Sequence, residues 1–505
     1  MFARIYGATI LGLHGNIITV ETDISNGLPA FEIVGLATTS VKESKERVRS
    51  AMKNSGYEFP MRRITVNLAP ADLKKDSAGL DAAIAIGIMV SSGQIPAEKC
   101  QQTMFIGELA LDGNVRPVTG ILPMILQGVA DGFRTFFVST ANAAEALLCG
   151  DAVIYAVSSF SDIVEHLLGT TRLSPAVPAA SLHSTLEYTV DFSEVQGQFT
   201  AKRALEIAAA GGHNVLMIGP PGSGKTMLAK RIPTILPPMN HQESLEVTKI
   251  YSVAGLFKQS QMMSVRPFRS PHHTISTAGL IGGGSIPKPG EVTLSHNGVL
   301  FLDELPEFPR SVLEVLRQPL EDGIVHIARV NAALSYPARF VLIAAMNPCP
   351  CGFLGDKDHP CTCTTGEIRR YARKISGPLL DRIDLHVTVE RPNYAELITE
   401  IPQESSAAIR SRVLKARQIQ EERLRGFGLS CNAHMGHREI KETCPLTKEA
   451  QLLLEQVFNK LKLSARSYDR IIKVSRTIAD LSHSKEIDDT HVAEAVSYRN
   501  TLQRM

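Results

Sequence analysis

The chain has 505 residues, of which 44% are hydrophobic and 21% charged; this is ordinary for globular domains, and the length allows about three of them. The formal net charge of +2 excludes a chain that is basic over its whole surface, so a nucleic-acid partner would need basic residues concentrated on one face. The longest early apolar run, residues 82–90, is far shorter than the ~20 residues that span a bilayer, and the first residues have no signal-peptide core, so we expect a cytoplasmic protein with no membrane partner.

Residues 1–168 have the pattern of one mixed α+β domain. Residues 16–22 and 30–34 alternate apolar and polar side chains, which predicts strands with one face in water. Residues 40–54 have the charge and apolar spacing of an exposed helix, whereas residues 80–90 are apolar on nearly all sides and predict a buried helix.

The pattern changes after residues 169–190, which are rich in Pro, Ser, Thr and Ala without periodicity and indicate a linker. Residues 191–392 alternate helical and strand patterns around a Gly-rich loop, which predicts an α/β domain with a parallel sheet. Residues 393–505 are helical and basic, with helical spacing over 409–425 and 446–481. The expected fold class is therefore α/β, with a helical lid after the core.

The strongest motif is a phosphate-binding loop between an apolar strand at 214–218 and a helix that opens with residues 227–230. Glycines let successive backbone N–H groups turn inward around phosphates at a helix N-terminus, while Lys225 adds positive charge and the Thr226 hydroxyl suits Mg²⁺. The alternative interpretation is an ordinary Gly/Pro turn that contains a lysine by chance. Such a turn does not require a strand before it and a helix after it. We therefore predict that ATP and Mg²⁺ bind at Gly219, Pro220, Pro221, Gly222, Ser223, Gly224, Lys225 and Thr226.

Polar residues follow two further apolar strands. Asp303 and Glu304 come directly after residues 299–302, where Asp303 suits the Mg²⁺ shell and Glu304 the general base that activates water. Alone, an apolar run that ends in Asp-Glu is usually just a strand end, so this prediction depends on the loop above. Asn347 follows a strand at 339–346; it either orients the attacking water or caps the turn before Pro348.

Four of the eight cysteines lie within residues 349–363. They form two C-x-C pairs around a polar loop and could supply four thiolates to a tetrahedral zinc, although this spacing is tighter than usual. His359 is a substitute ligand, and a reduced loop of buried thiols or a redox pair are the alternatives. The predicted zinc ligands are Cys349, Cys351, Cys361 and Cys363.

Five segments in this order resemble the magnesium-chelatase-like AAA+ ATPases, and within them the ComM/YifB family. The resemblance extends over nearly the whole chain. The segments are GPPGSGKT (219–226), RPFRSPHHTIS (266–276), GEVTLSHNGVLFLDELPEF (290–308), AAMNPCPCG (344–352) and SGPLLDRIDLHV (376–387).

The resemblance implies a homo-hexameric ring with ATP at the subunit interfaces. Asn347 would then be the first sensor, and Arg382 the arginine finger that completes the neighbouring subunit's site in trans. Arg466 matches the second sensor in the lid, with Arg470 as the competing residue. Without the family match, both Arg382 and Arg466 would be interpreted as ordinary surface ion pairs.

The N-terminal region resembles the Lon-protease-like α+β domain found in this family and in the RadA repair ATPases. The matching segments are 66–70, 105–109 and 115–120. Active Lon domains use a Ser–Lys dyad, but Ala78 stands at the serine position, beside Ser77, and Leu122 stands where the lysine is needed. Because a serine without its base is a poor nucleophile, we expect a structural or DNA-contacting module.

A ring motor would contact DNA through loops between its strands, and two such loops carry basic residues. The first is 282–290, with Lys288, and the second is a hairpin predicted at 323–340, with Arg329. The alternatives are an ordinary flexible connection and a solvated face.

Three functions remain open. The first is a hexameric helicase that binds branched DNA, single- or double-stranded, without sequence preference, and promotes branch migration of recombination intermediates in natural transformation. The second is the ATPase subunit of a magnesium chelatase, although such subunits are not expected to carry the Lon-like domain or the cysteine insertion. The third is an ATP-dependent protease, which Ala78 and Leu122 disfavour.

Overall fold

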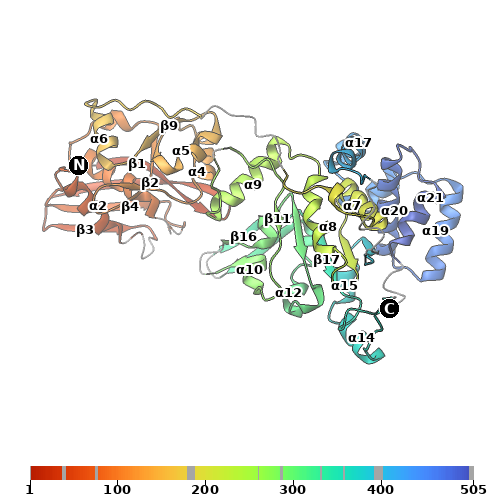
Figure 1. Cartoon of the computed structure of the whole chain (residues 1–505). Coiled ribbons are helices and arrows are strands. Elements are labelled where there is room, and N and C mark those ends of the chain that lie inside the picture. Colours follow the sequence, from red (N-terminus) through yellow and green to blue (C-terminus); the bar gives the residue numbers. More distant parts are fainter. Residues whose placement is uncertain are drawn as a thin grey trace. The chain divides into compact units, whose positions relative to one another are not determined.

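The structure is a computed structural model that describes residues 2–499 except 37–40, 42, 74, 76–77, 179–187, 260, 285–287, 330–331, 357–358 and 392–401. The chain forms two compact units (Figure 1). The N-terminal unit comprises Met1–Ser184 and Ser244–Met263, and the C-terminal unit comprises Thr185–Glu243 and Ser264–Met505. Each unit is described by itself.

The N-terminal unit contains a seven-stranded mixed sheet with the order β3-β4-β2-β1-β5-β8-β9. β2 pairs antiparallel with β1 and β4, and the other neighbours are parallel. The strand predictions at 16–22 and 30–34 are confirmed, because these residues lie in β2 and β3. The strands are β1 (Phe2–Leu11), β2 (His14–Ser25), β3 (Ala30–Val34), β4 (Arg63–Ala69), β5 (Thr103–Ile106), β8 (Thr135–Ser139) and β9 (Val153–Val157).

Helices pack on this sheet. α3 is buried at almost every residue, as its apolar sequence predicts, whereas α2 buries only one face. Five helices are described in the first segment of the unit: α2 (Ser44–Asn54), α3 (Asp81–Ser91), α4 (Ile121–Ala130), α5 (Thr140–Ala146) and α6 (Phe160–Leu168). Most of α9 (His241–Val253) also belongs here; its Ser252 hydroxyl donates a hydrogen bond to the partly buried Glu145 of α5.

The C-terminal unit contains a five-stranded sheet with the order β11-β14-β17-β10-β18, in which every neighbouring pair is parallel. Every residue of β10 and β14 is buried, as expected for a parallel sheet that is covered on both faces. The predicted α/β fold class is confirmed. The strands are β10 (Val215–Ile218), β11 (Phe268–Arg269), β14 (Val299–Leu302), β17 (Val341–Met346) and β18 (Leu385–Thr388).

Short elements project from this core. The predicted hairpin is present as β15 (Ile324–Arg329) paired antiparallel with β16 (Ala332–Pro337). The segment 282–290 also contains a small antiparallel pair, β12 (Gly282–Gly283) with β13 (Lys288–Pro289).

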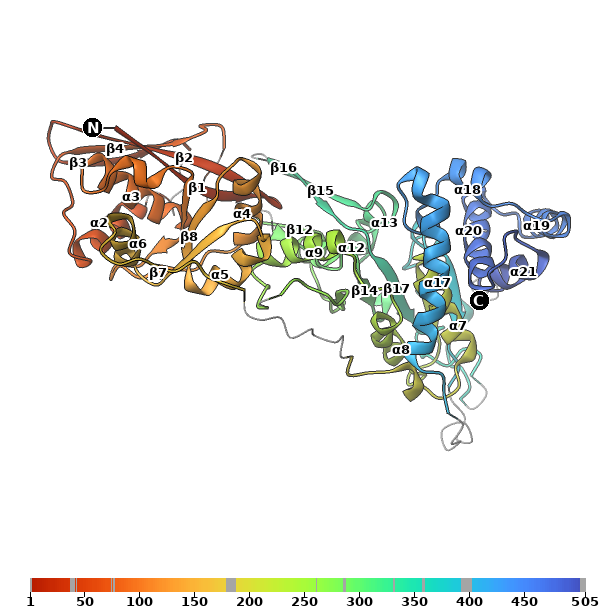
Figure 2. The ribbon, with the colours of Figure 1, turned by 90° about the horizontal axis from the view of Figure 1, so that it is seen from above.

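The lid is helical, and Figure 2 shows its helices in blue, grouped on one side of the core of this unit. Two of them, α17 and α20, pack on α7 (Phe199–Gly211), the helix that precedes β10. The helical spacing over 446–481 is divided between α19 and α20, because Lys462 has a φ of +46° and ends α19. The lid helices are α17 (Ser406–Leu424), α18 (His437–Thr443), α19 (Lys448–Leu461), α20 (Ala465–Leu481) and α21 (Asp489–Ser497).

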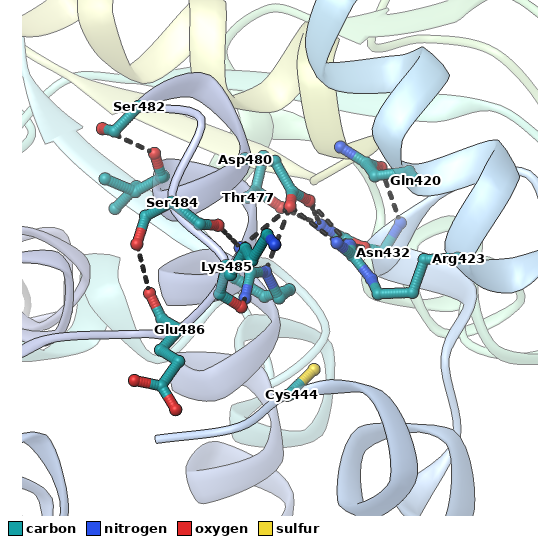
Figure 3. A network of polar contacts seen from close by, with 12 residues as sticks. Gln420, Arg423, Asn432, Cys444, Thr477, Asp480, Ser482, Ser484, Lys485 and Glu486 are labelled. Atoms are coloured by element: carbon teal, nitrogen blue, oxygen red, sulfur yellow. Dashed lines mark hydrogen bonds and ion pairs between the residues drawn. The ribbon is translucent and has the colours of Figure 1, made fainter. Parts of the chain in front are cut away.

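A buried polar network holds the lid together (Figure 3). Arg423 of α17 donates two hydrogen bonds of 2.7 Å to the two oxygens of Asp480 in α20. Asn432 donates to Asp480 over 2.9 Å and to Thr477 over 3.0 Å, and the Arg476 guanidinium donates to Asp480 over 3.1 Å. Because Asp480 is fully buried, these partners replace the water that its charge loses on folding.

Among the described residues, no helix is both long enough and apolar enough to cross a membrane.

Candidate functional site

The phosphate-binding loop links the central strand β10 to α8 (Lys225–Arg231). Gly222 and Gly224 have φ values of +78° and +88°, a left-handed conformation that glycine adopts without a steric penalty. The loop leads directly into α8, whose first N–H groups have no acceptor within the helix. The predicted strand–loop–helix context is therefore present.

The Lys225 amine lies inside this loop. Its Nζ donates hydrogen bonds to the carbonyl oxygens of Gly219 and Pro220 over 2.7 and 2.8 Å, and to Asn347 Oδ1 over 3.3 Å. Burial lowers the pKa of Lys225, while the charge of Asp303 opposes this shift. The structure thus brings together three of the residues singled out from the sequence: the lysine, the carboxylate and the strand-end amide.

Thr226 and Asp303 also meet. The Thr226 hydroxyl donates a hydrogen bond of 2.7 Å to Asp303 Oδ2, which joins the start of α8 to the end of β14. A hydroxyl and a carboxylate are hard oxygen ligands of the kind that Mg²⁺ prefers. The two side chains therefore fit the predicted magnesium site.

Glu304 occupies a strained position at the end of β14. Its φ of +52° is in the left-handed region, which costs a non-glycine residue roughly 1–2 kcal/mol. Such strain is typical of functional sites. The side chain is 58% exposed, so the carboxylate is accessible to water.

His273 is a neighbour of Glu304 that the sequence reasoning did not assign. Its Nδ1 lies 3.4 Å from Glu304 Oε2, and its ring lies 4.0 Å from that of His272. The sequence did contain a signal, because the two histidines belong to the motif at 266–276.

The two arginines singled out from the sequence lie together. Arg382 precedes β18 and is nearly buried, whereas Arg466 in the first turn of α20 is 65% exposed. Both donate to Glu321 of α13 (Pro319–Asp322), Arg382 to Oε2 and Arg466 to Oε1, the latter over 3.3 Å. Arg470 instead pairs with Asp384 over 3.2 Å. Among the described residues, the side-chain hydrogen bonds of Arg382 go to Pro378 and Glu321 and not to the phosphate-binding loop.

A buried polar relay that the sequence reasoning missed fixes the backbone around Arg382. Asn214 donates its side-chain N–H to the Arg382 carbonyl over 3.0 Å and its backbone N–H to Asp384 over 3.3 Å. The fully buried His213 bridges Asp384, at 3.2 Å, and Thr477 of α20, at 2.8 Å. Burial would raise the pKa of Asp384, but the hydrogen bond from His213 and the charge of Arg470 outweigh it, so the pKa lies well below its usual value.

The four predicted zinc ligands converge after β17. The sulfur atoms of Cys349, Cys351, Cys361 and Cys363 lie within 4.8 Å of one another, and none of these cysteines is in a disulfide. Three of the sulfur pairs are 3.3, 3.6 and 3.7 Å apart. Tetrahedral zinc with Zn–S bonds of about 2.3 Å would place its sulfurs about 3.8 Å apart, so the cluster is compatible with a structural metal. His359 is outside this cluster and contacts Asp356 and Arg391.

The structure describes the predicted DNA contacts only in part. Lys288 is exposed in β13. Arg329 pairs with Ala332 at the described end of the hairpin, and its side chain lies outside the described residues. Both assignments stay predictions.

In the N-terminal unit, Leu122 is a fully buried residue of α4, and its N–H donates to Glu145 over 3.1 Å. Ala78 starts a short 3₁₀ turn, and Ser77 lies outside the described residues.

Three family models match the chain: "Magnesium chelatase, subunit ChlI" over residues 191–397, "Subunit ChlI of Mg-chelatase" over 20–142, and "Magnesium chelatase, subunit ChlI C-terminal" over 403–499. Competence protein ComM of Haemophilus influenzae is 44% identical over 98% of this chain and 97% of its own length. The uncharacterised protein YifB of Escherichia coli is 44% identical over 97% of this chain and 95% of its own length. The magnesium-chelatase 38 kDa subunit of Rhodobacter capsulatus is 24% identical over 46% of this chain and 65% of its own length.

Proposed function

Because the chain belongs to the ComM/YifB family of magnesium-chelatase-like AAA+ ATPases, we propose that it is an ATP-driven DNA motor that promotes branch migration of recombination intermediates. The observation that carries this proposal is the 44% identity, over almost the whole chain, to a protein named for competence. Competence implies handling of incoming DNA. The basic loops at 282–290 and 323–340 support it, because Lys288 and Arg329 would contact phosphates without reading bases.

In this proposal, hydrolysis is carried out by side chains at the ends of β10, β14 and β17. Lys225 and the backbone N–H groups of the loop bind the phosphates, and Thr226 and Asp303 hold Mg²⁺, which would neutralise phosphate charge. Glu304 accepts a proton from the attacking water, and Asn347 orients that water. The contact between Lys225 and Asn347, at 3.3 Å, supports a shared role at the outermost phosphate.

We further propose a homo-hexamer in which Arg382 and Arg466 act on the neighbouring subunit's ATP. Because Arg382 and Arg466 both bind Glu321, they lie close together. A neighbouring subunit that contacts one of them would therefore also contact the other. Arg466 is preferred to Arg470 as the second sensor because its side chain is 65% exposed, whereas that of Arg470 is 19% exposed.

The cysteine cluster serves a structural role in this proposal. A zinc ion held by Cys349, Cys351, Cys361 and Cys363 would fix the polar loop that directly follows Asn347. The alternative role of the cysteines is a redox pair. Because zinc itself is redox-inactive, that role would require two of these thiols to form a disulfide.

A magnesium-chelatase subunit is the second proposal, because the matching family models carry that description. It is weaker because the chelatase subunit of Rhodobacter capsulatus covers 46% of this chain, whereas ComM covers 98%. The protease alternative would need another base, since a leucine at 122 cannot act as one.

The ATPase rate of assembled protein tests these proposals directly. It is measured with branched DNA, with porphyrin plus Mg²⁺, and with unfolded protein, and the Lys225→Ala variant serves as the inactive control. We expect stimulation by branched DNA and ATP-dependent strand exchange at four-way junctions. Stimulation by porphyrin and not by DNA would favour the chelatase instead, and no response to DNA of any shape would leave only the ATPase.

A further inference from the structure

The carboxylate of Glu321 binds two arginines at once. Its Oε2 accepts from Arg382 Nη2, and its Oε1 accepts from Arg466 Nη2 over 3.3 Å. Arg382 belongs to the α/β core and Arg466 to the lid, 84 positions further along the chain (466 − 382). One short helix, α13, therefore bridges the two arginines that the proposed function assigns to hydrolysis.

Other contacts hold Arg382 and the helix that carries Arg466 in place. The Arg382 guanidinium donates to the Pro378 carbonyl over 2.8 Å, and its own carbonyl accepts from Asn214. The start of α20, which carries Arg466, is tied to the core through the ion pair of Arg470 with Asp384. These contacts hold Arg382 and the start of α20 in place, and Glu321 joins the two guanidinium groups.

Charge explains why a carboxylate is needed there. Two guanidinium groups that approach one point repel each other, and an anion between them removes most of that repulsion. The hydrogen bond from Arg382 and the charges of Arg382 and Arg466 hold the pKa of Glu321 below its usual range, so the carboxylate is ionised at neutral pH. Glutamine could keep only one acceptor oxygen and no charge.

We propose that Glu321 is a positioning residue that presents Arg382 and Arg466 as one preorganised pair to the ATP of the neighbouring subunit. This inference rests on the proposed roles of the two arginines. A fixed pair would stabilise charge in the transition state without reorganisation when the reaction occurs. Glu321 itself contacts neither the phosphate-binding loop nor the general base among its described hydrogen bonds, so its loss should change turnover and not nucleotide binding.

The test compares Glu321→Ala, Glu321→Gln and the neighbouring Asp322→Ala in the full chain, as assembled rings without DNA. We expect Glu321→Ala to lower kcat at least 10-fold with unchanged KM, ATP affinity and thermal midpoint, and Glu321→Gln to fall between it and wild type. Asp322→Ala, an exposed change on the same helix, should keep the wild-type rate.

A mutant cycle with Arg382→Ala and Arg466→Ala separates positioning from a general structural effect. If Glu321 acts through these two arginines, adding Glu321→Ala to the Arg382→Ala/Arg466→Ala variant should slow turnover no further. If the losses in kcat caused by Glu321→Ala and by the arginine changes multiply, the inference is wrong. A wild-type kcat for Glu321→Ala would also overturn it. Wild-type turnover by Arg382→Ala would instead overturn the arginine roles in the proposed function and this inference with them, whereas a lack of DNA stimulation leaves the cycle unaffected.

Discussion

The Thr226 hydroxyl donates a hydrogen bond of 2.7 Å to the Asp303 carboxylate, although the two residues are separated by β17, the strand between β10 and β14. Both lie at the carboxyl edge of a parallel sheet, where α/β proteins bind their ligands. Their contact places the start of α8 beside the end of β14 and leaves Glu304 as the next residue, exposed to water.

We expect Glu304→Gln to keep ATP binding and ring assembly while turnover falls about 10²- to 10⁴-fold, the usual contribution of a general base. Lys225→Ala should weaken ATP binding itself, because it removes the charge inside the loop. Binding of a fluorescent ATP analogue and steady-state phosphate release measure the two effects separately. Near wild-type hydrolysis by Glu304→Gln would show that another group acts as the base.

Sequence reasoning singled out the residues whose type and local context suggest a role. The loop at 219–226, the strand-end residues Asp303, Glu304 and Asn347 and the four cysteines could be found, because an apolar run followed by polar residues is visible in the linear chain. The predicted fold class followed from the same strand and helix pattern.

The residues it missed act through partners distant in sequence. Glu321 meets residues 61 and 145 positions away, and Asn214 meets one 168 positions away. No local pattern contains such pairs. The sequence pattern also does not predict the break between α19 and α20. The helical spacing continues past Lys462 and carries no information on the positive φ of that residue.

Arg382→Ala should bind ATP normally yet hydrolyse it about 10³- to 10⁵-fold more slowly, as expected for loss of an arginine finger. Mixed rings with excess Lys225→Ala protein should recover part of the activity, because each variant supplies the half-site that the other lacks. Phosphate release is measured at several mixing ratios, with assembly checked by light scattering. Verified mixed rings that stay inactive would argue against action in trans.

Metal analysis of purified protein should find about one zinc per chain, by the four-ligand rule. Cys349→Ser and Cys361→Ser should each lower the zinc content and the folded yield, because a site with three thiolates binds zinc more weakly. Cys100→Ser is the matched control, since Cys100 is a buried free cysteine outside the cluster. Metal-free protein with unchanged stability would end the zinc hypothesis.

The lid network predicts a local change in stability. Arg423→Ala should destabilise the lid by about 2–3 kcal/mol, less than the ~3–5 kcal/mol for a wholly broken buried pair, because Arg476 and Asn432 still bind Asp480. Hydrogen–deuterium exchange of α17 and α20 peptides should therefore accelerate by more than an order of magnitude. Arg438→Ala removes an exposed pair with Glu442 and should leave exchange unchanged. Equal effects of the two variants would contradict this role of the network.

Two loops of the C-terminal unit are expected to contact DNA. Lys288 is exposed in β13, and Arg329 lies at the described end of β15, in the two loops expected to follow phosphates. Lys288→Ala and Arg329→Ala should each reduce stimulation of the ATPase by branched DNA while basal hydrolysis stays at the wild-type rate, because neither residue belongs to the phosphate-binding loop.

The dependence on salt distinguishes phosphate contacts from an indirect effect. For duplex DNA, each lost phosphate contact should reduce the slope of log affinity against log salt by about 0.9. Arg438→Ala, which removes an exposed positive charge in the lid, is the control and should keep the wild-type slope. Wild-type slopes for Lys288→Ala and Arg329→Ala would exclude these two side chains as DNA contacts.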